Sequence, residues 1–179
     1  MWWGEPTDQR QPRVEAPYSR EPVAPLEDPD LAREIAAVAA GYPTKQAALL
    51  PALHLTQRKH GWISPAAEAF VARELGLMPS HVAGAVTFYT LYKTRPMGRH
   101  HIQVCRTLSC AISGNEEMIE YLKTKLGIQP GEVTADGRFS LVLVECLGAC
   151  GYAPMFQVND DYHEHLTQEK VDALLESMT

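Results

Sequence analysis

Basic charge and long apolar runs are both scarce in this chain of 179 residues. Its 16 Lys and Arg residues are outnumbered by 22 Asp and Glu residues, which gives a formal net charge of −6. A chain without a clustered basic face lacks the electrostatic footprint of a nucleic-acid-binding protein. No apolar run approaches the roughly 18 residues that a membrane-spanning helix needs. We therefore expect neither nucleic acid binding nor direct insertion into a membrane.

Targeting and nucleotide-binding motifs are missing as well. The N-terminal stretch MWWGEPTDQR has neither the basic and apolar regions of a secretory signal nor the Arg-rich, acid-poor composition of a mitochondrial presequence. We therefore expect a cytoplasmic protein, in which thiols stay reduced. Four cysteines in that compartment favour metal or redox chemistry over structural disulfides. No G-x-G-x-x-G motif follows a predicted strand, so we expect no nicotinamide or flavin site in this chain.

Proline is distributed unevenly along the chain. Six of the 13 prolines lie in the first 29 residues, at Pro6, Pro12, Pro17, Pro22, Pro25 and Pro29. This segment mixes proline with charge and has little apolar periodicity, which is typical of a disordered or extended region. We assign residues 1–29 to such an arm, in which Trp2, Trp3 and Tyr18 are the candidate contacts with a partner.

Residues 30–97 have the pattern of a small helical bundle. Helices are expected over residues 30–40, 44–60, 65–75 and 79–89. Gly41, Gly61 and Gly76 follow three of them as stop signals. Thr44 is the expected cap of the second helix, and Pro51 within it should kink or restart that helix.

Residues 98–179 change to a mixed pattern of strands and helices. Strands are expected over residues 101–105 and 140–145, and a hairpin over residues 155–158 and 162–166. Ser113-x-x-Glu116 is a capping-box pattern that predicts a helix ending at Gly127, and Thr167 should cap a final helix. The chain as a whole is therefore predicted to be α+β, with a small α/β domain after a helical bundle.

All four cysteines lie in this second domain, in two close pairs. Cys105-x₄-Cys110 and Cys146-x₃-Cys150 each begin where a predicted strand ends. Loops that leave neighbouring strand ends can approach each other, so the two pairs can supply four thiolates to one centre. Structural zinc and a [2Fe–2S] cluster both accept four cysteines, and this spacing leaves both open, with two disulfides as a third alternative.

Several polar side chains near these pairs have candidate roles. The hydroxyls of Thr107 and Ser113 can bond to a sulfur or cap the nearby helix, so loss of either should lower the midpoint potential of a bound cluster. His163 and His165 flank Glu164 in a predicted strand and should share one face. We interpret that face as solvated rather than as a second metal site.

Five stretches of the sequence carry a resemblance to a known family. HIQVCRTLSC, LGIQPGEVTADGRFSL and VECLGACGYAPMFQVND resemble the [2Fe–2S] 24-kDa subunit of respiratory complex I, known as the E subunit in bacterial NADH:quinone oxidoreductases. HVAGAVTFYTLY and LLPALHLTQRKHGWI are similar to the helical domain of that family. The resemblance runs from about residue 31 to the C-terminus and leaves out the arm.

The resemblance implies a cofactor, a set of ligands and a fold. Cys105, Cys110, Cys146 and Cys150 would bind one [2Fe–2S] cluster, and residues 98–179 would form a thioredoxin-like ferredoxin domain. Pro154 would correspond to the cis-proline of the thioredoxin fold.

The resemblance also implies a partner and a role. A larger subunit would carry FMN and oxidise NADH, and this chain would exchange single electrons with that flavin without being catalytic alone. The complex would be a respiratory NADH:quinone oxidoreductase, with this chain in its peripheral part on the cytoplasmic side of the membrane. Related subunits serve NAD-linked formate dehydrogenases and hydrogenases, and a non-redox Cys₄ zinc module is the alternative from another class.

Overall fold

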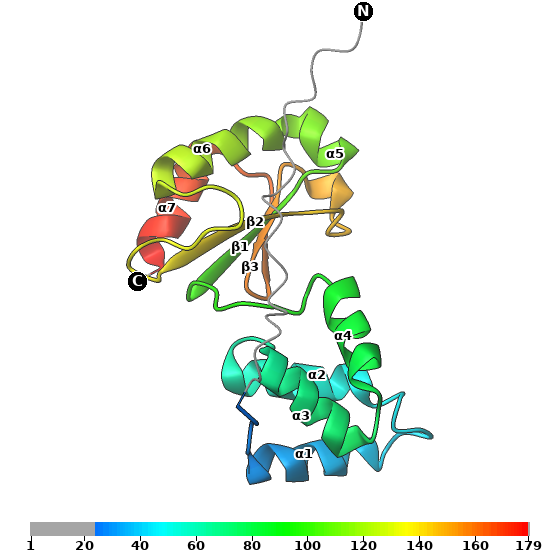
Figure 1. Cartoon of the computed structure of the whole chain (residues 1–179). Coiled ribbons are helices and arrows are strands. Elements are labelled where there is room, and N and C mark those ends of the chain that lie inside the picture. Colours follow the sequence, from blue (N-terminus) through cyan, green and yellow to red (C-terminus); the bar gives the residue numbers. More distant parts are fainter. Residues whose placement is uncertain (1–23, 179) are drawn as a thin grey trace, which may run out of the picture. The chain divides into compact units, whose positions relative to one another are not determined.

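The computed structural model describes residues 24–178, which divide into two compact units at Pro96 and Met97 (Figure 1). Each unit has its own hydrophobic core. Among the described residues, no helix is both long and apolar enough to cross a membrane. Most of the predicted arm, including Trp2, Trp3 and Tyr18, lies outside the described residues.

The first unit consists of four short helices. They are α1 (Pro29–Ala39), α2 (Leu49–His60), α3 (Pro65–Leu75) and α4 (Pro79–Phe88). Ser64 caps α3 by accepting a hydrogen bond from the backbone N–H of Ala67, and Gly61 and Gly76 end α2 and α3 in the left-handed conformation. The helices enclose a core in which Leu31, Leu53 and Phe70 are almost fully buried.

The second helix is shorter than predicted. It begins at Leu49 rather than at Thr44, so Pro51 lies in its first turn. A proline fits the first turn because its missing N–H has no intrahelical partner there. The Thr44 hydroxyl accepts a hydrogen bond from Ala47, but this bond closes a turn and does not cap α2. Pro51 therefore does not kink α2; instead the helix begins five residues later than predicted.

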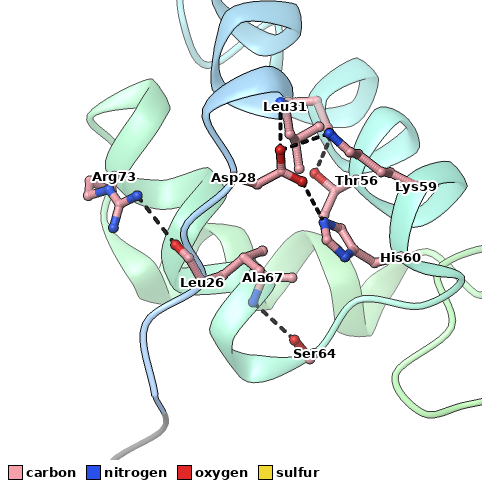
Figure 2. Close-up of polar contacts among 10 residues, drawn as sticks. Leu26, Asp28, Leu31, Thr56, Lys59, His60, Ser64, Ala67 and Arg73 are labelled. Atoms are coloured by element: carbon pink, nitrogen blue, oxygen red, sulfur yellow. Dashed lines mark hydrogen bonds and ion pairs between the residues drawn. The ribbon is translucent and has the colours of Figure 1, made fainter.

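The residues just before α1 are anchored on the bundle by polar contacts (Figure 2). The Asp28 carboxylate accepts a hydrogen bond from the N–H of Leu31 at 3.0 Å and lies 2.7 Å from Lys59 Nζ and 3.3 Å from His60 Nε2. Asp28 therefore caps α1 and also ties it to the C-terminal turn of α2. The carbonyl of Leu26 accepts a hydrogen bond from Arg73 of α3.

The second unit is built on a mixed sheet in the order β2-β1-β3-β4. The strands are β1 (His100–Cys105), β2 (Phe139–Val144), β3 (Phe156–Val158) and β4 (Asp161–His163). β1 pairs with β2 in parallel and with β3 antiparallel, and β3 pairs antiparallel with β4. The longer helices are α6 (Glu116–Leu126) and α7 (Gln168–Ser177), and the latter is capped by Thr167 as predicted.

Two features of this sheet position the cysteine loops. Because β1 and β2 are parallel, with Cys105 beside Val144, the loops that leave both strands emerge at the same edge. The β1 loop leads directly into the short helix α5 (Leu108–Cys110), which Figure 1 shows next to the end of the sheet. The peptide bond between Ala153 and Pro154 is cis and lies just before β3, as the resemblance implied.

Two local predictions in this unit are wrong. Ser113 does not cap a helix: it lies in a π-helical turn (Ala111–Asn115), and its hydroxyl donates to the carbonyl of Ser109 at 2.7 Å. The turn is broken by Gly114 at φ 103°, a left-handed conformation that glycine adopts easily, so α6 starts only at Glu116. His163 and His165 do not share a strand face, since β4 ends at His163 and His165 has φ 48°.

Candidate functional site

The four cysteines come from the two loops that leave β1 and β2. Cys105 is the last residue of β1 and Cys110 the last of α5, while Cys146 and Cys150 follow the end of β2. Cys105 and Cys110 are buried and form a small apolar cluster with Met155. Cys146 and Cys150 are exposed. The site therefore has one pair of thiols inside the domain and one pair at its surface.

In the buried pair, one sulfur accepts hydrogen bonds and the other donates. Burial alone would raise the pKa of Cys105, but hydrogen bonds from Thr107, from the Cys110 thiol and from the Leu147 backbone hold that pKa below its ordinary value. Burial raises the pKa of Cys110 to about 12, and its own hydrogen bond to Cys105 adds to the effect. In the hydrogen bond between the two sulfurs, Cys105 is therefore the acceptor and Cys110 the donor.

The exposed pair repeats this arrangement. The two sulfur atoms of Cys146 and Cys150 lie 3.5 Å apart. The backbone N–H of Gly148 lies 3.3 Å from the Cys146 sulfur and, with the Cys150 thiol, lowers the pKa of Cys146. The hydrogen bond to Cys146 and the negative charge there raise the pKa of Cys150.

The two pairs face each other across the loops. Negative charge at Cys146 and Cys150 contributes to the raised pKa of Cys110, and Cys105 contributes in the same way at Cys150. Two contacts also cross between the loops. The Leu147 backbone bonds to Cys105, and the Thr107 hydroxyl lowers the pKa of Cys146 while lying 3.1 Å from the Cys105 sulfur. All four cysteines named from the sequence are thus brought into one site.

The hydroxyl groups around the sulfurs differ in part from those predicted. Thr107 contacts a sulfur, as expected. Ser113 does not, because its single O–H is donated to the Ser109 carbonyl. Ser109, which the sequence reasoning missed, bonds to Cys150 and acts to lower its pKa. Its position inside the Cys105-x₄-Cys110 spacer was the available signal, since a hydroxyl between two clustered cysteines has sulfur within reach.

This donor set fits a binuclear cluster. Four thiolates in one site repel one another, and burial of Cys105 and Cys110 makes negative charge on that pair more costly still, unless a metal centre compensates it. A [2Fe–2S] cluster takes two protein ligands at each iron, which corresponds to two pairs of thiols that face each other. Among residues 24–178, no group of three or more His, Cys, Asp or Glu side chains is placed so that it could hold a metal ion.

Fold and site together define a small thioredoxin-like domain with four cysteines at one sheet edge, preceded by a helical unit. Residues 35–179 match the family model of the thioredoxin-like [2Fe-2S] ferredoxins. The chain belongs to this family. The predicted family and the predicted α+β fold class are thereby confirmed.

Relatives of known name extend over most of the chain. The second E subunit of the NADH-quinone oxidoreductase of Rhizobium meliloti is 48% identical over 144 residues, which are 80% of this chain and 86% of the relative. The NADH-quinone oxidoreductase subunit 2 of Thermus thermophilus is 48% identical over 139 residues, 76% of this chain and 77% of the relative.

A solved structure shows a similar fold in a different assembly. An NAD⁺-reducing [NiFe]-hydrogenase in the H₂-reduced state aligns with a TM-score of 0.63 at 28% identity. The alignment covers 73% of this chain but only 22% of the hydrogenase chain. The likeness therefore concerns one segment of that larger protein.

Proposed function

We propose that this chain is the electron-transfer subunit of an NADH:quinone oxidoreductase and holds one [2Fe–2S] cluster on Cys105, Cys110, Cys146 and Cys150. The observation that carries the proposal is the meeting of two cysteine pairs at one sheet edge, with backbone and hydroxyl donors directed at their sulfurs. The names of the relatives that align over most of the chain support the assembly.

The cluster, when bound, supplies one-electron redox chemistry. The chain's own residues would set the midpoint potential at which the cluster accepts an electron. Hydrogen bonds from Thr107, Ser109 and the backbone N–H groups of Leu147 and Gly148 favour negative charge on sulfur and would therefore raise the midpoint potential of a cluster held there. Burial of Cys105 and Cys110 beside Met155 opposes this by disfavouring charge.

A partner subunit that carries FMN and oxidises NADH would supply and accept the electrons. The surface around the two cysteine loops supports such a contact, because several large apolar side chains of these loops face solvent. Leu108 is 76% exposed, Ile112 79% and Tyr152 53%. Each of the three lies two residues from a cysteine. Exposed apolar groups of this kind are typical of protein–protein contact sites, and we place the flavin-bearing subunit on this face, at the cytoplasmic side of the membrane.

Spectroscopy with metal analysis tests the cluster directly. The purified full chain should be red-brown, bleach with dithionite and contain two irons and two sulfides per chain, in the ratio that one [2Fe–2S] cluster requires. Single Cys→Ser variants at the four positions should lose or alter the visible spectrum. A colourless protein with stoichiometric zinc would instead establish the zinc module and end this proposal.

Isolation of the native complex tests the assembly. A tagged full chain should co-purify with a flavin-containing, NADH-oxidising subunit and with quinone reductase activity. The alignment with the NAD⁺-reducing hydrogenase makes hydrogenase the second candidate. Co-purification with a hydrogenase or formate dehydrogenase subunit, and not with a quinone-reducing complex, would reassign the chain to that assembly.

A further inference from the structure

A buried asparagine joins the first cysteine loop to the strand that lies across the site. Asn115 is completely buried at the end of the π-helical turn. Its Nδ2 donates to the carbonyl of Cys105 at 2.7 Å and to the carbonyl of Met155 at 2.8 Å. One side-chain amide thus connects a cysteine of the site to the methionine in the same buried cluster as Cys105 and Cys110.

The register of the sheet explains why a side-chain amide is needed between Cys105 and Met155. The antiparallel ladder of β1 and β3 ends at the pair Val104 and Phe156. The next pair would be Cys105 and Met155, and at that point the cis-proline loop begins. The two N–H groups of the Asn115 amide bridge these two carbonyls, where the strands no longer bond to each other.

The surroundings of Asn115 indicate that this residue serves a purpose other than stabilising the fold. Asn115 Oδ1 is buried and has no hydrogen-bond partner among the described residues, which costs free energy. The residue follows Gly114 at φ 103° in a π-helical turn, and such turns occur frequently at functional sites. The turn directs the amide of Asn115 back to the end of β1, ten residues earlier in the chain.

We propose that Asn115 is a positioning residue that fixes Cys105 and Met155 to each other and thereby sets the geometry of the buried pair of cluster thiolates. The inference rests on the proposed cluster site and adds a residue that binds no metal. Loss of the two hydrogen bonds releases the end of β1 from the Met155 backbone and leaves it held on the β2 side alone. Cys105 then shifts relative to Cys110, and the cluster is held less tightly and in a different geometry.

The test compares Asn115→Leu and Asn115→Asp, which keep the approximate shape of the side chain and remove its donors, with wild-type protein. We expect cluster release to a chelator to accelerate about tenfold. The electron paramagnetic resonance spectrum of the dithionite-reduced protein and the midpoint potential should also shift. A purely structural role elsewhere in the domain would leave the spectrum and the potential unchanged.

Ser140→Ala is the matched control. Ser140 is equally buried, and its hydroxyl lies 2.8 Å from His101 Nδ1, at the end of β1 opposite to Cys105. This variant should retain the wild-type spectrum, potential and release rate. If both Asn115 variants matched it, or if both failed to fold while Ser140→Ala folds, the positioning role would be overturned.

A measurement on metal-free protein separates this inference from the proposed function. Asn115→Leu should accelerate hydrogen exchange at the backbone N–H of Arg106, which donates to Val144 next to Cys105. This outcome does not depend on a cluster. Unchanged exchange there would contradict the positioning role, whereas a wild-type protein that binds no iron would contradict only the cluster proposal.

Discussion

At the scale of single residues, the site depends on which hydrogen-bond donors reach the sulfurs. Thr107 and Ser109 are two positions apart in one loop, and they reach different cysteines of the other pair. Ser113, only four residues further, points its hydroxyl at a backbone carbonyl instead. Hydroxyl groups with similar spacing in the sequence therefore differ in function because the π-helical turn redirects one of them.

This difference gives a prediction for the redox potential. Thr107→Val should lower the midpoint potential of the bound cluster by about 40 mV, because about 1 kcal/mol of hydrogen-bond energy gained on reduction is lost. Ser113→Ala should leave the potential unchanged. Redox titration monitored by visible absorption measures both, and an equal shift in the two variants would refute the assignment of donors.

At the scale of elements, close backbone approach and helix caps determine where strands and helices meet. Gly98 lies just before β1 and against the start of β2. A Cβ atom at Gly98 would lie 2.4 Å from the carbonyl carbon of Phe139, closer than real contacts allow. The close approach of Gly98 to Phe139 lets β1 and β2 pair in register at the end of the sheet opposite to the cysteines.

Gly98→Ala should therefore destabilise the second unit, by about 1–3 kcal/mol as in other overpacked sites. Urea unfolding followed by circular dichroism measures the loss. Gly84→Ala in α4 is the contrasting variant, because a Cβ there meets open space and alanine favours the helix by about 1 kcal/mol. Equal stability of Gly98→Ala and wild type would show that the strands separate without cost.

The cap of α1 should make the helical unit sensitive to acid. The hydrogen bond from Lys59, with that from the Leu31 backbone, lowers the pKa of Asp28 below its ordinary value. A carboxyl group whose pKa is lower in the folded state stabilises the fold above its unfolded pKa. This contribution is lost as the pH falls from about 4 through the lower folded value.

Asp28→Asn should weaken the helical unit at neutral pH and flatten the fall of its stability below about pH 4. Thermal unfolding followed at several pH values measures this dependence. Asp30→Asn is a suitable comparison, since Asp30 contacts only the exposed Arg33 among the ion pairs of the described residues. An acid dependence that is identical in Asp28→Asn and wild type would exclude this origin.

At the scale of the whole molecule, the chain has two units with separate cores, and only one of them contains the cysteines. The four cysteines and the sheet lie within residues 97–178, and the four-helix core lies within residues 24–96. A bound metal centre stabilises the unit that contains its ligands, because binding favours the folded state over the unfolded one.

Removal of the cluster from the intact protein should therefore lower the unfolding temperature of the second unit and leave that of the helical unit nearly unchanged. Hydrogen exchange by mass spectrometry, with and without cluster, resolves the two units in one sample. A uniform loss of protection across both units would show that they unfold together.

Much of the fold follows from local rules that act within a few residues. Ser64-Pro65 with Gly76 bounds α3, Thr167 caps α7, and the spacing of apolar residues marks β1. The failures also have a common cause. Thr44 and Ser113 are both of a residue type that caps helices, but a proline and a left-handed glycine move the true helix starts five and three residues further on.

The sequence alone determined the two cysteine pairs and the resemblance to the [2Fe–2S] family. It also determined where the all-helical pattern gives way to a pattern of strands and helices. All three are properties of residue spacing and composition. Only the tertiary structure decided which groups surround the sulfurs. The Leu147 backbone reaches the Cys105 sulfur from 42 residues away, through the parallel pairing of β1 with β2. Asn115 reaches the Cys105 carbonyl from 10 residues away, through the turn before α6. Contacts of that kind depend on strand order and register, which no local pattern specifies.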